Sequence, residues 1–189
     1  MPAVAQVRKI RPGYVVIHPN RDKAVCKFTK LMVIAVLLAS VALMLIVTIG
    51  GWSKLQGMKP VNFIWMGLYA GAAYYIGRWA RGLLPIVAIL GLLLVIIAAI
   101  ATFGWAGTSW FDRSADGFGP AASLLGGNGL SPDVLGTLTL VLIPVELALI
   151  VVSLIGFSQG WNVEIEVPLE EARRRGSKPI ATGPNAAPA

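Results

Sequence analysis

Four long apolar runs divide the chain, and each is bounded by glycine, proline or charged residues. They cover residues 31–51, 60–76, 82–103 and 136–157. A helix needs about 20 predominantly apolar residues to cross about 30 Å of hydrocarbon, so the pattern predicts four transmembrane helices. The first run is too long for the apolar part of a signal peptide, and no convincing cleavage site follows it. We therefore expect it to remain in the protein as a span.

Shorter patterns outside these runs predict a small second element. The segments "YVVIHP" (residues 14–19) and "WNVEIEV" (residues 161–167) both have the composition of β-strands, and the second also has their alternation of apolar and polar residues. We expect them to pair into a two-stranded ribbon, which is marginal alone and needs the membrane surface, the helix ends or a partner. "LEEARRR" (residues 169–175) predicts a short helix with acids first and arginines last. The remaining tail has little apolar mass and is predicted to be disordered.

The distribution of basic residues predicts the orientation. Most of the 16 Lys and Arg residues lie before the first run, between the second and third runs, or in the C-terminal tail. Cytoplasmic flanks retain such charges, so both termini are predicted to be cytoplasmic. The basic residues nearest the spans are expected to contact lipid headgroups: Lys23, Lys27, Lys30, Arg78 and Arg81. Topology and lipid contact account for most of the net charge of +7, and we expect no nucleic-acid partner.

Composition agrees with a membrane location. The chain is 56% hydrophobic and 13% charged, whereas soluble domains are about 25% charged. The prediction is an all-α integral protein of the cell membrane with four transmembrane helices and a small cytoplasmic two-stranded β element. Its parts are a basic cytoplasmic tail with a strand (1–30), a helical domain (31–157) with an extracytoplasmic loop (104–135), and a cytoplasmic strand, short helix and disordered tail (158–189).

The sequence offers little material for catalysis or for binding metals. It has one His and one Cys, and no paired carboxylates, metal-ligand motif, nucleophile motif or phosphate-binding glycine loop. We predict that it is not an enzyme and has no cofactor or metal, with His18 unligated and Cys26 a free thiol. The loop from Asp112 to Asp116 matches half of a calcium motif, but Ser123 stands where the motif needs a glutamate. An ordinary turn is the preferred interpretation, and ion binding stays open.

Glu146 stands alone in the apolar run "LIPVELALI". A charged carboxylate at the bilayer centre costs about 2.5–3.5 kcal/mol on insertion scales, so such residues usually face protein. Because desolvation favours the neutral form, we expect Glu146 to be protonated unless a cation lies beside it.

Other polar residues share the expected face and depth of Glu146. Residues seven apart lie on one helix face to within about 20°. This spacing relates Thr139, Glu146 and Ser153 on the last helix and Asn62 and Tyr69 on the second. Tyr69 and Glu146 each lie roughly 15 Å below the outer end of their helix. With Ser40 at a similar depth, they predict a midplane cluster of Glu146, Tyr69 and Ser40, to which the third helix adds only aliphatic side chains.

Helix shape and packing have their own signals. Pro144 removes a backbone donor and predicts a local kink in the last helix. Small residues four apart permit close helix approach, and the spans contain such pairs in Gly67 with Gly71 and in Ala35 with Ala39. The glycines lie nearly opposite Tyr69 on their helix. The second span is therefore expected to contact neighbours on both sides, one of which could belong to another chain.

Three roles for Glu146 stay open at this point. The carboxyl could hold helices together through a hydrogen bond, move protons or ions, or contact a helix of another subunit. The favoured function is an accessory or scaffold subunit whose partners are the lipid bilayer and other membrane subunits or a second copy of itself. The alternatives are a small proton- or ion-conducting or transport protein that uses Glu146, and a lipid-binding or sensory protein that uses the basic tail.

Overall fold

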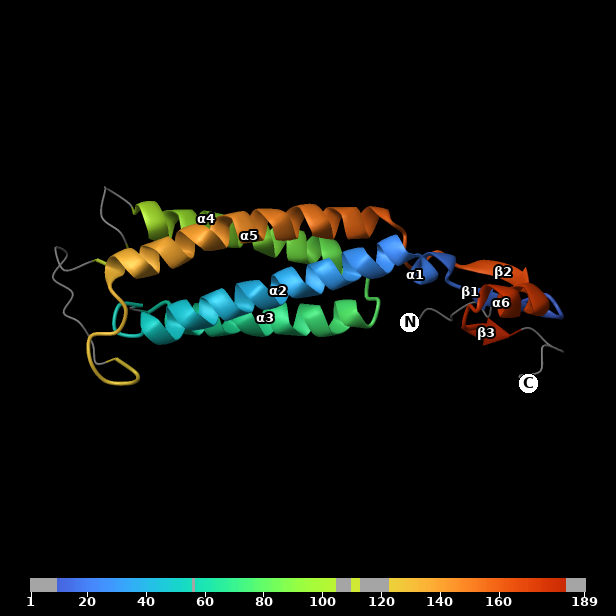
Figure 1. The fold of residues 1–189 in the computed structure, drawn as a ribbon, viewed down its shortest axis with the longest axis horizontal. Coiled ribbons are helices and arrows are strands. Elements are labelled where there is room, and N and C mark those ends of the chain that lie inside the picture. Colours follow the sequence, from blue (N-terminus) through green and yellow to red (C-terminus); the bar gives the residue numbers. More distant parts are fainter. Residues whose placement is uncertain (1–9, 56, 105–109, 113–122, 183–189) are drawn as a thin grey trace, which may run out of the picture. The chain divides into compact units, whose positions relative to one another are not determined.

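The computed structural model describes residues 10–55, 57–104, 110–112 and 123–182 (Figure 1). The chain forms two compact units. One unit contains both ends of the chain, residues 1–27 and 159–189, and the other is the helical unit of residues 28–158.

Four long helices form the helical unit and run side by side (Figure 1). They are α2 (Ala24–Gly50), α3 (Lys59–Gly77), α4 (Leu83–Phe103) and α5 (Pro132–Ser158). Three of them, α2, α4 and α5, are long and apolar enough to cross a membrane. The chain is therefore mostly helical, with three candidate membrane spans. α3 lies where the second span was expected, but asparagine, tryptophan, tyrosines and glycines make it less apolar.

The helix ends follow local signals. Pro132 is the first residue of α5, and the Val134 amide donates to the Ser131 hydroxyl at 3.4 Å, so this serine caps the helix. α5 therefore begins before the apolar run that predicted it. It continues as helix on both sides of Pro144.

The small unit is built on a sheet of order β2-β1-β3. β1 (Tyr14–Ile17) pairs antiparallel with β2 (Ile165–Pro168), and this confirms the predicted pairing. The third strand, β3 (Ala181–Thr182), was not predicted. The predicted ribbon thus gains a third strand from the segment that was predicted to be a disordered tail. The free edge of β1 pairs with backbone, which needs no apolar side chains: the Ile180 amide donates to the Val16 carbonyl at 2.9 Å. The end of the predicted tail, residues 183–189, lies outside the described residues.

A short helix completes this small core. α6 (Leu169–Arg175) forms where it was predicted and ends at Gly176, whose φ of +64° suits glycine. The core consists of buried apolar side chains from the two paired strands and this helix: Val15, Ile17, Val167 and Ala172.

Polar contacts tie the segment after α5 to α1 (Pro19–Asp22) within the same unit. The Asn20 amide donates to the carbonyls of Gln159 and Gly160 at 3.1 and 3.0 Å. The Arg21 guanidinium donates to the Trp161 carbonyl at 3.3 Å. Burial lowers the pKa of Arg21, while nearby Glu164 acts in the opposite direction. The two distant parts of the sequence are thus joined by side chains that satisfy backbone carbonyls.

Candidate functional site

A buried contact between α3 and α5 is the centre of the site. Glu146 and Tyr69 are both 0% exposed, and the Tyr69 hydroxyl donates to Glu146 Oε2 at 2.7 Å. Ser40 of α2 is also fully buried and interacts with the same carboxyl. Its own hydroxyl donates to the Val36 carbonyl at 3.1 Å. The structure therefore brings Glu146, Tyr69 and Ser40 together from three helices.

The third long helix, α4, contributes a glycine that was not predicted as part of the site. A Cβ atom on Gly91 of α4 would lie 3.2 Å from Glu146 Oε2 and 3.2 Å from Ile150 Cγ1. The aliphatic side chains of this helix were predicted, but the role of its glycine was not, since here the absence of a side chain makes room for the carboxyl. The available signal was a single glycine in the aliphatic run of residues 86–101. We name Ser40, Tyr69, Gly91 and Glu146 the carboxyl layer.

Hydrogen bonding in and near this layer is incomplete. Glu146 Oε1 and the Ser153 hydroxyl are buried without a hydrogen-bond partner among the described residues. No cation of the described chain is among the groups that act on the carboxyl. The Tyr69–Glu146 contact is therefore a hydrogen bond between side chains and not part of an ion pair.

A second polar contact lies seven residues from the first. The Asn62 amide of α3 donates to the Thr48 hydroxyl of α2 at 3.0 Å, and Thr48 donates to the Met44 carbonyl at 2.6 Å. Thr139 of α5 donates to the Leu135 carbonyl at 2.7 Å within its own helix. Thr48 was not predicted, although its polar side chain within the first apolar run was a signal. Asn62 and Thr139 are thus at the same end of the bundle but do not bond to each other.

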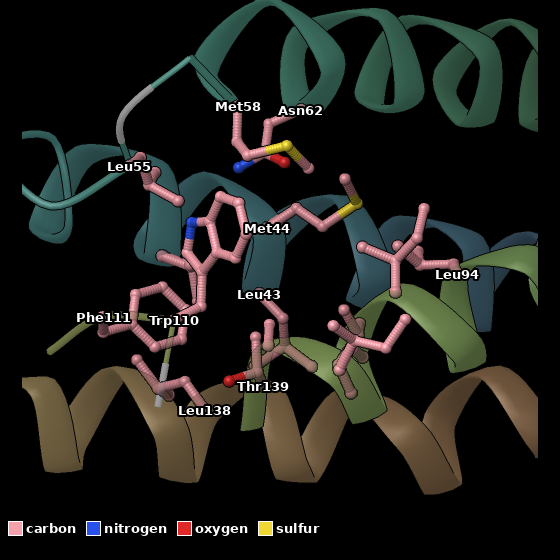
Figure 2. Close-up of a pocket in the computed structure, with 16 residues that line it drawn as sticks. Leu43, Met44, Leu55, Met58, Asn62, Leu94, Trp110, Phe111, Leu138 and Thr139 are labelled. Carbon is pink, nitrogen blue, oxygen red and sulfur yellow. The ribbon is translucent and has the colours of Figure 1, made fainter. Parts of the chain in front are cut away.

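A cavity of about 220 Å³ separates Asn62 from Thr139. Asn62 projects from α3 on one side and Thr139 from α5 on the other, with Trp110 between them (Figure 2). All four long helices contribute lining residues. The remaining walls come from the connection between α2 and α3 and from Trp110 and Phe111.

The predicted packing residues lie on the surface of the helical unit. Gly67 is exposed and Gly71 is partly buried, and a Cβ atom on either would meet nothing within 4 Å. Ala35 and Ala39 are exposed on α2, and Pro144 is exposed on α5. Within the described chain, the space beside Gly67 and Gly71 is therefore not filled by another helix.

Basic residues of the helical unit bind helix ends. Lys30 Nζ donates to the Gly77 carbonyl at 3.2 Å and lies 4.0 Å from the centre of the Trp79 ring. Arg81 Nε donates to the Phe157 carbonyl at 2.8 Å. The last carbonyls of a helix have no partner within it, so these contacts satisfy the ends of α3 and α5. The other predicted headgroup residues, Lys23, Lys27 and Arg78, are exposed. Arg78 also donates a hydrogen bond to the Tyr74 hydroxyl.

The half calcium motif is described only in part. Asp112 and Ser123 belong to the described chain, and Asp116 lies outside it. Among the described residues, no group of three or more His, Cys, Asp and Glu side chains could hold a metal ion. Cys26 is buried and is not in a disulfide.

Comparisons with protein-family models, curated proteins and solved structures found no match. The carboxyl layer itself supplies one carboxyl, one phenol and one hydroxyl, enclosed by four helices. Such a set can hold helices in register, and its carboxyl can take up or release one proton.

Proposed function

We propose that this chain is a non-catalytic protein of the cell membrane that crosses it four times with both termini in the cytoplasm. α3 is the span that this proposal adds to the three candidate spans α2, α4 and α5. Its 19 residues give a length of about 28 Å, close to the hydrocarbon thickness of about 30 Å. It contacts neighbouring helices through Asn62 near its start, Tyr69 in its middle and Gly77 at its end. A helix held at these three levels crosses wherever its neighbours cross.

The topology predicts opposite labelling at the two ends of α3. In a Cys26→Ser background, Pro60→Cys would react with a membrane-impermeant maleimide from outside the cell. Gly82→Cys would react only after the membrane is opened. Labelling of both positions from the same side would show that α3 does not cross.

Within this topology, we propose that the protein acts as an accessory or scaffold subunit. One observation carries this proposal: α3 buries Tyr69 in its own chain, while Gly67 and Gly71 have open space where a Cβ would project. In lipid, helices associate through close packing of small residues, because the hydrophobic effect does not drive apolar helices together there. The glycine face of α3 suits the close approach of a helix from another membrane subunit or from a second copy.

Native mass spectrometry after extraction in a mild detergent tests the association. We expect the wild-type protein to retain a second chain and Gly67→Leu/Gly71→Leu to lose it. Gly136→Leu is the matched control, because Gly136 on α5 also has open space around its Cβ position. A wild-type protein that is monomeric and stable, or a double variant that keeps its partner, would rule out the glycine face as the interface.

A second candidate function is proton or ion conduction through Glu146. The observation that favours it is the pair of buried atoms without hydrogen-bond partners in the described chain, Glu146 Oε1 and Ser153 Oγ, on one face of α5. Glu146→Gln preserves shape and hydrogen bonding but removes the titrating group. Proton flux into liposomes should therefore disappear in this variant, and an equal flux in both proteins would eliminate conduction through Glu146.

A further inference from the structure

The cavity lies one helical turn from the carboxyl layer. Leu142 precedes Glu146 by four residues, Met44 follows Ser40 by four, and Leu94 follows Gly91 by three. Residues at these spacings share a helix face. All three line the cavity, so it occupies the next layer of the bundle, toward the end where α2 stops and α5 begins.

The walls of the cavity are almost entirely apolar. Three of its lining side chains carry polar atoms: Asn62, Thr139 and the indole of Trp110. Asn62 and Thr139 already donate hydrogen bonds, to the Thr48 hydroxyl and the Leu135 carbonyl respectively. A buried water needs two to four polar partners, and an apolar cavity of about 150 Å³ stays dry and binds benzene. At about 220 Å³ this cavity is larger and its walls are similar in character. It therefore suits a hydrocarbon occupant better than water.

The opening and the methionine lining of the cavity favour a chain over a compact ring. It is partly open, so an occupant need not fit inside completely. Met44 and Met58 line it, and the unbranched thioether side chain of methionine adapts to irregular apolar shapes. Acyl chains are also the most abundant apolar groups around a protein with three candidate membrane spans.

We propose that this cavity binds one end of an acyl chain. The terminal methylenes lie among the apolar side chains of the four helices, and the rest of the chain leaves through the open side. The site is distinct from the glycine face of α3, and its occupancy does not depend on a partner subunit. An acyl chain could come from a membrane phospholipid or from a free fatty acid.

Photolabelling tests the site directly. The full-length protein in liposomes is irradiated with a fatty acid that carries a diazirine near its methyl end, and labelled peptides are mapped by mass spectrometry. Label is expected on peptides that contain Met44, Met58 or Trp110. Competition with excess unlabelled fatty acid, compared with excess phosphatidylglycerol, identifies the source of the chain, and failure of both to compete contradicts the proposal.

Variants that fill the cavity sharpen the test. Ala98 and Ala101 line it, so Ala98→Leu and Ala101→Leu each place added methyl groups inside. We expect either variant to lose labelling by about tenfold, which corresponds to about 1.4 kcal/mol of binding free energy. Ala148→Leu on the exposed side of α5 is the control and should label like the wild type. Equal labelling of filled and control proteins, or label spread evenly over the lipid-facing peptides, would overturn the proposal.

Discussion

In the small unit the core is apolar, with Val15, Ile17 and Val167 inside and most charged side chains outside. In the helical unit the pattern is partly reversed. Its described residues include every buried polar or charged side chain in the structure: Thr29, Ser40, Thr48, Ser53, Thr139, Glu146 and Ser153. Its exposed surface carries large aliphatic residues along all four helices. We propose that the two units differ because they fold in different solvents, water for one and hydrocarbon for the other.

A charge placed at equally exposed positions in the two units should have the largest and most unequal effect. Leu93 of α4 is 45% exposed and Val163 of the small unit is 46% exposed. Leu93→Lys should oppose membrane insertion by about 2.5–3.5 kcal/mol, because the charge would enter hydrocarbon. Val163→Lys should change the stability of the small unit by no more than about 0.5 kcal/mol. An insertion assay for the first and thermal unfolding for the second measure the two effects. Equal tolerance of both substitutions would contradict a membrane environment for α4.

Filling the space beside Glu146 should have the next largest effect. Gly91→Leu forces a side chain against Glu146 Oε2 and Ile150, and overpacking of this kind costs about 1–3 kcal/mol. Gly136→Leu, at a helical glycine with open space, should be nearly neutral. Thermal unfolding in detergent micelles compares the two. A Gly91→Leu protein as stable as Gly136→Leu would show that α4 does not pack closely on the carboxyl.

Much of this arrangement follows from the pattern of the sequence. Apolar runs place the four long helices, and a spacing of seven residues together with equal depth relates Tyr69 to Glu146. These features depend on side-chain identity at regular intervals, and a single sequence records them directly. The pairing of β1 with β2 was predictable for a similar reason, since composition identifies both strands and alternation supports the second.

The features that sequence reasoning missed depend on packing and not on pattern. Gly91 contributes the absence of a side chain, and its importance appears only when Glu146 is placed beside it. β3 forms through backbone hydrogen bonds to an available strand edge, which leaves little trace in side-chain composition. The cavity near Asn62 and Thr139 is a volume left over between four helices, and no local spacing predicts such a volume.

Removal of the buried hydrogen bond should have a moderate effect. Tyr69→Phe removes the hydroxyl that donates to Glu146 Oε2, so the carboxyl loses this hydrogen bond. Hydrogen bonds between membrane helices contribute about 0.6 kcal/mol on average and at most about 1.7 kcal/mol, so the loss should fall in this range. Tyr75→Phe is the control, because Tyr75 is exposed on the same helix. If unfolding in micelles showed the same stability for both variants, the carboxyl layer would contribute nothing to helix association.

The smallest effect is expected for an exposed ion pair in the small unit. Arg175 and Glu171 form an i,i+4 pair on α6, with side chains 48% and 44% exposed. Water screens such pairs, which typically contribute about 0.3–0.5 kcal/mol on helices. Glu171→Gln should therefore lower the stability of the small unit by no more than this, and about 1 M salt should remove most of the difference because it shortens the screening length to about 3 Å.

The buried Tyr69–Glu146 bond lies beyond the reach of solvent ions, so the loss caused by Tyr69→Phe should be independent of salt. Parallel salt titrations of the two variants would show whether each polar contact is exposed to water or shielded from it. If the loss of stability in Tyr69→Phe depended on salt, water would reach the inside of the helical unit.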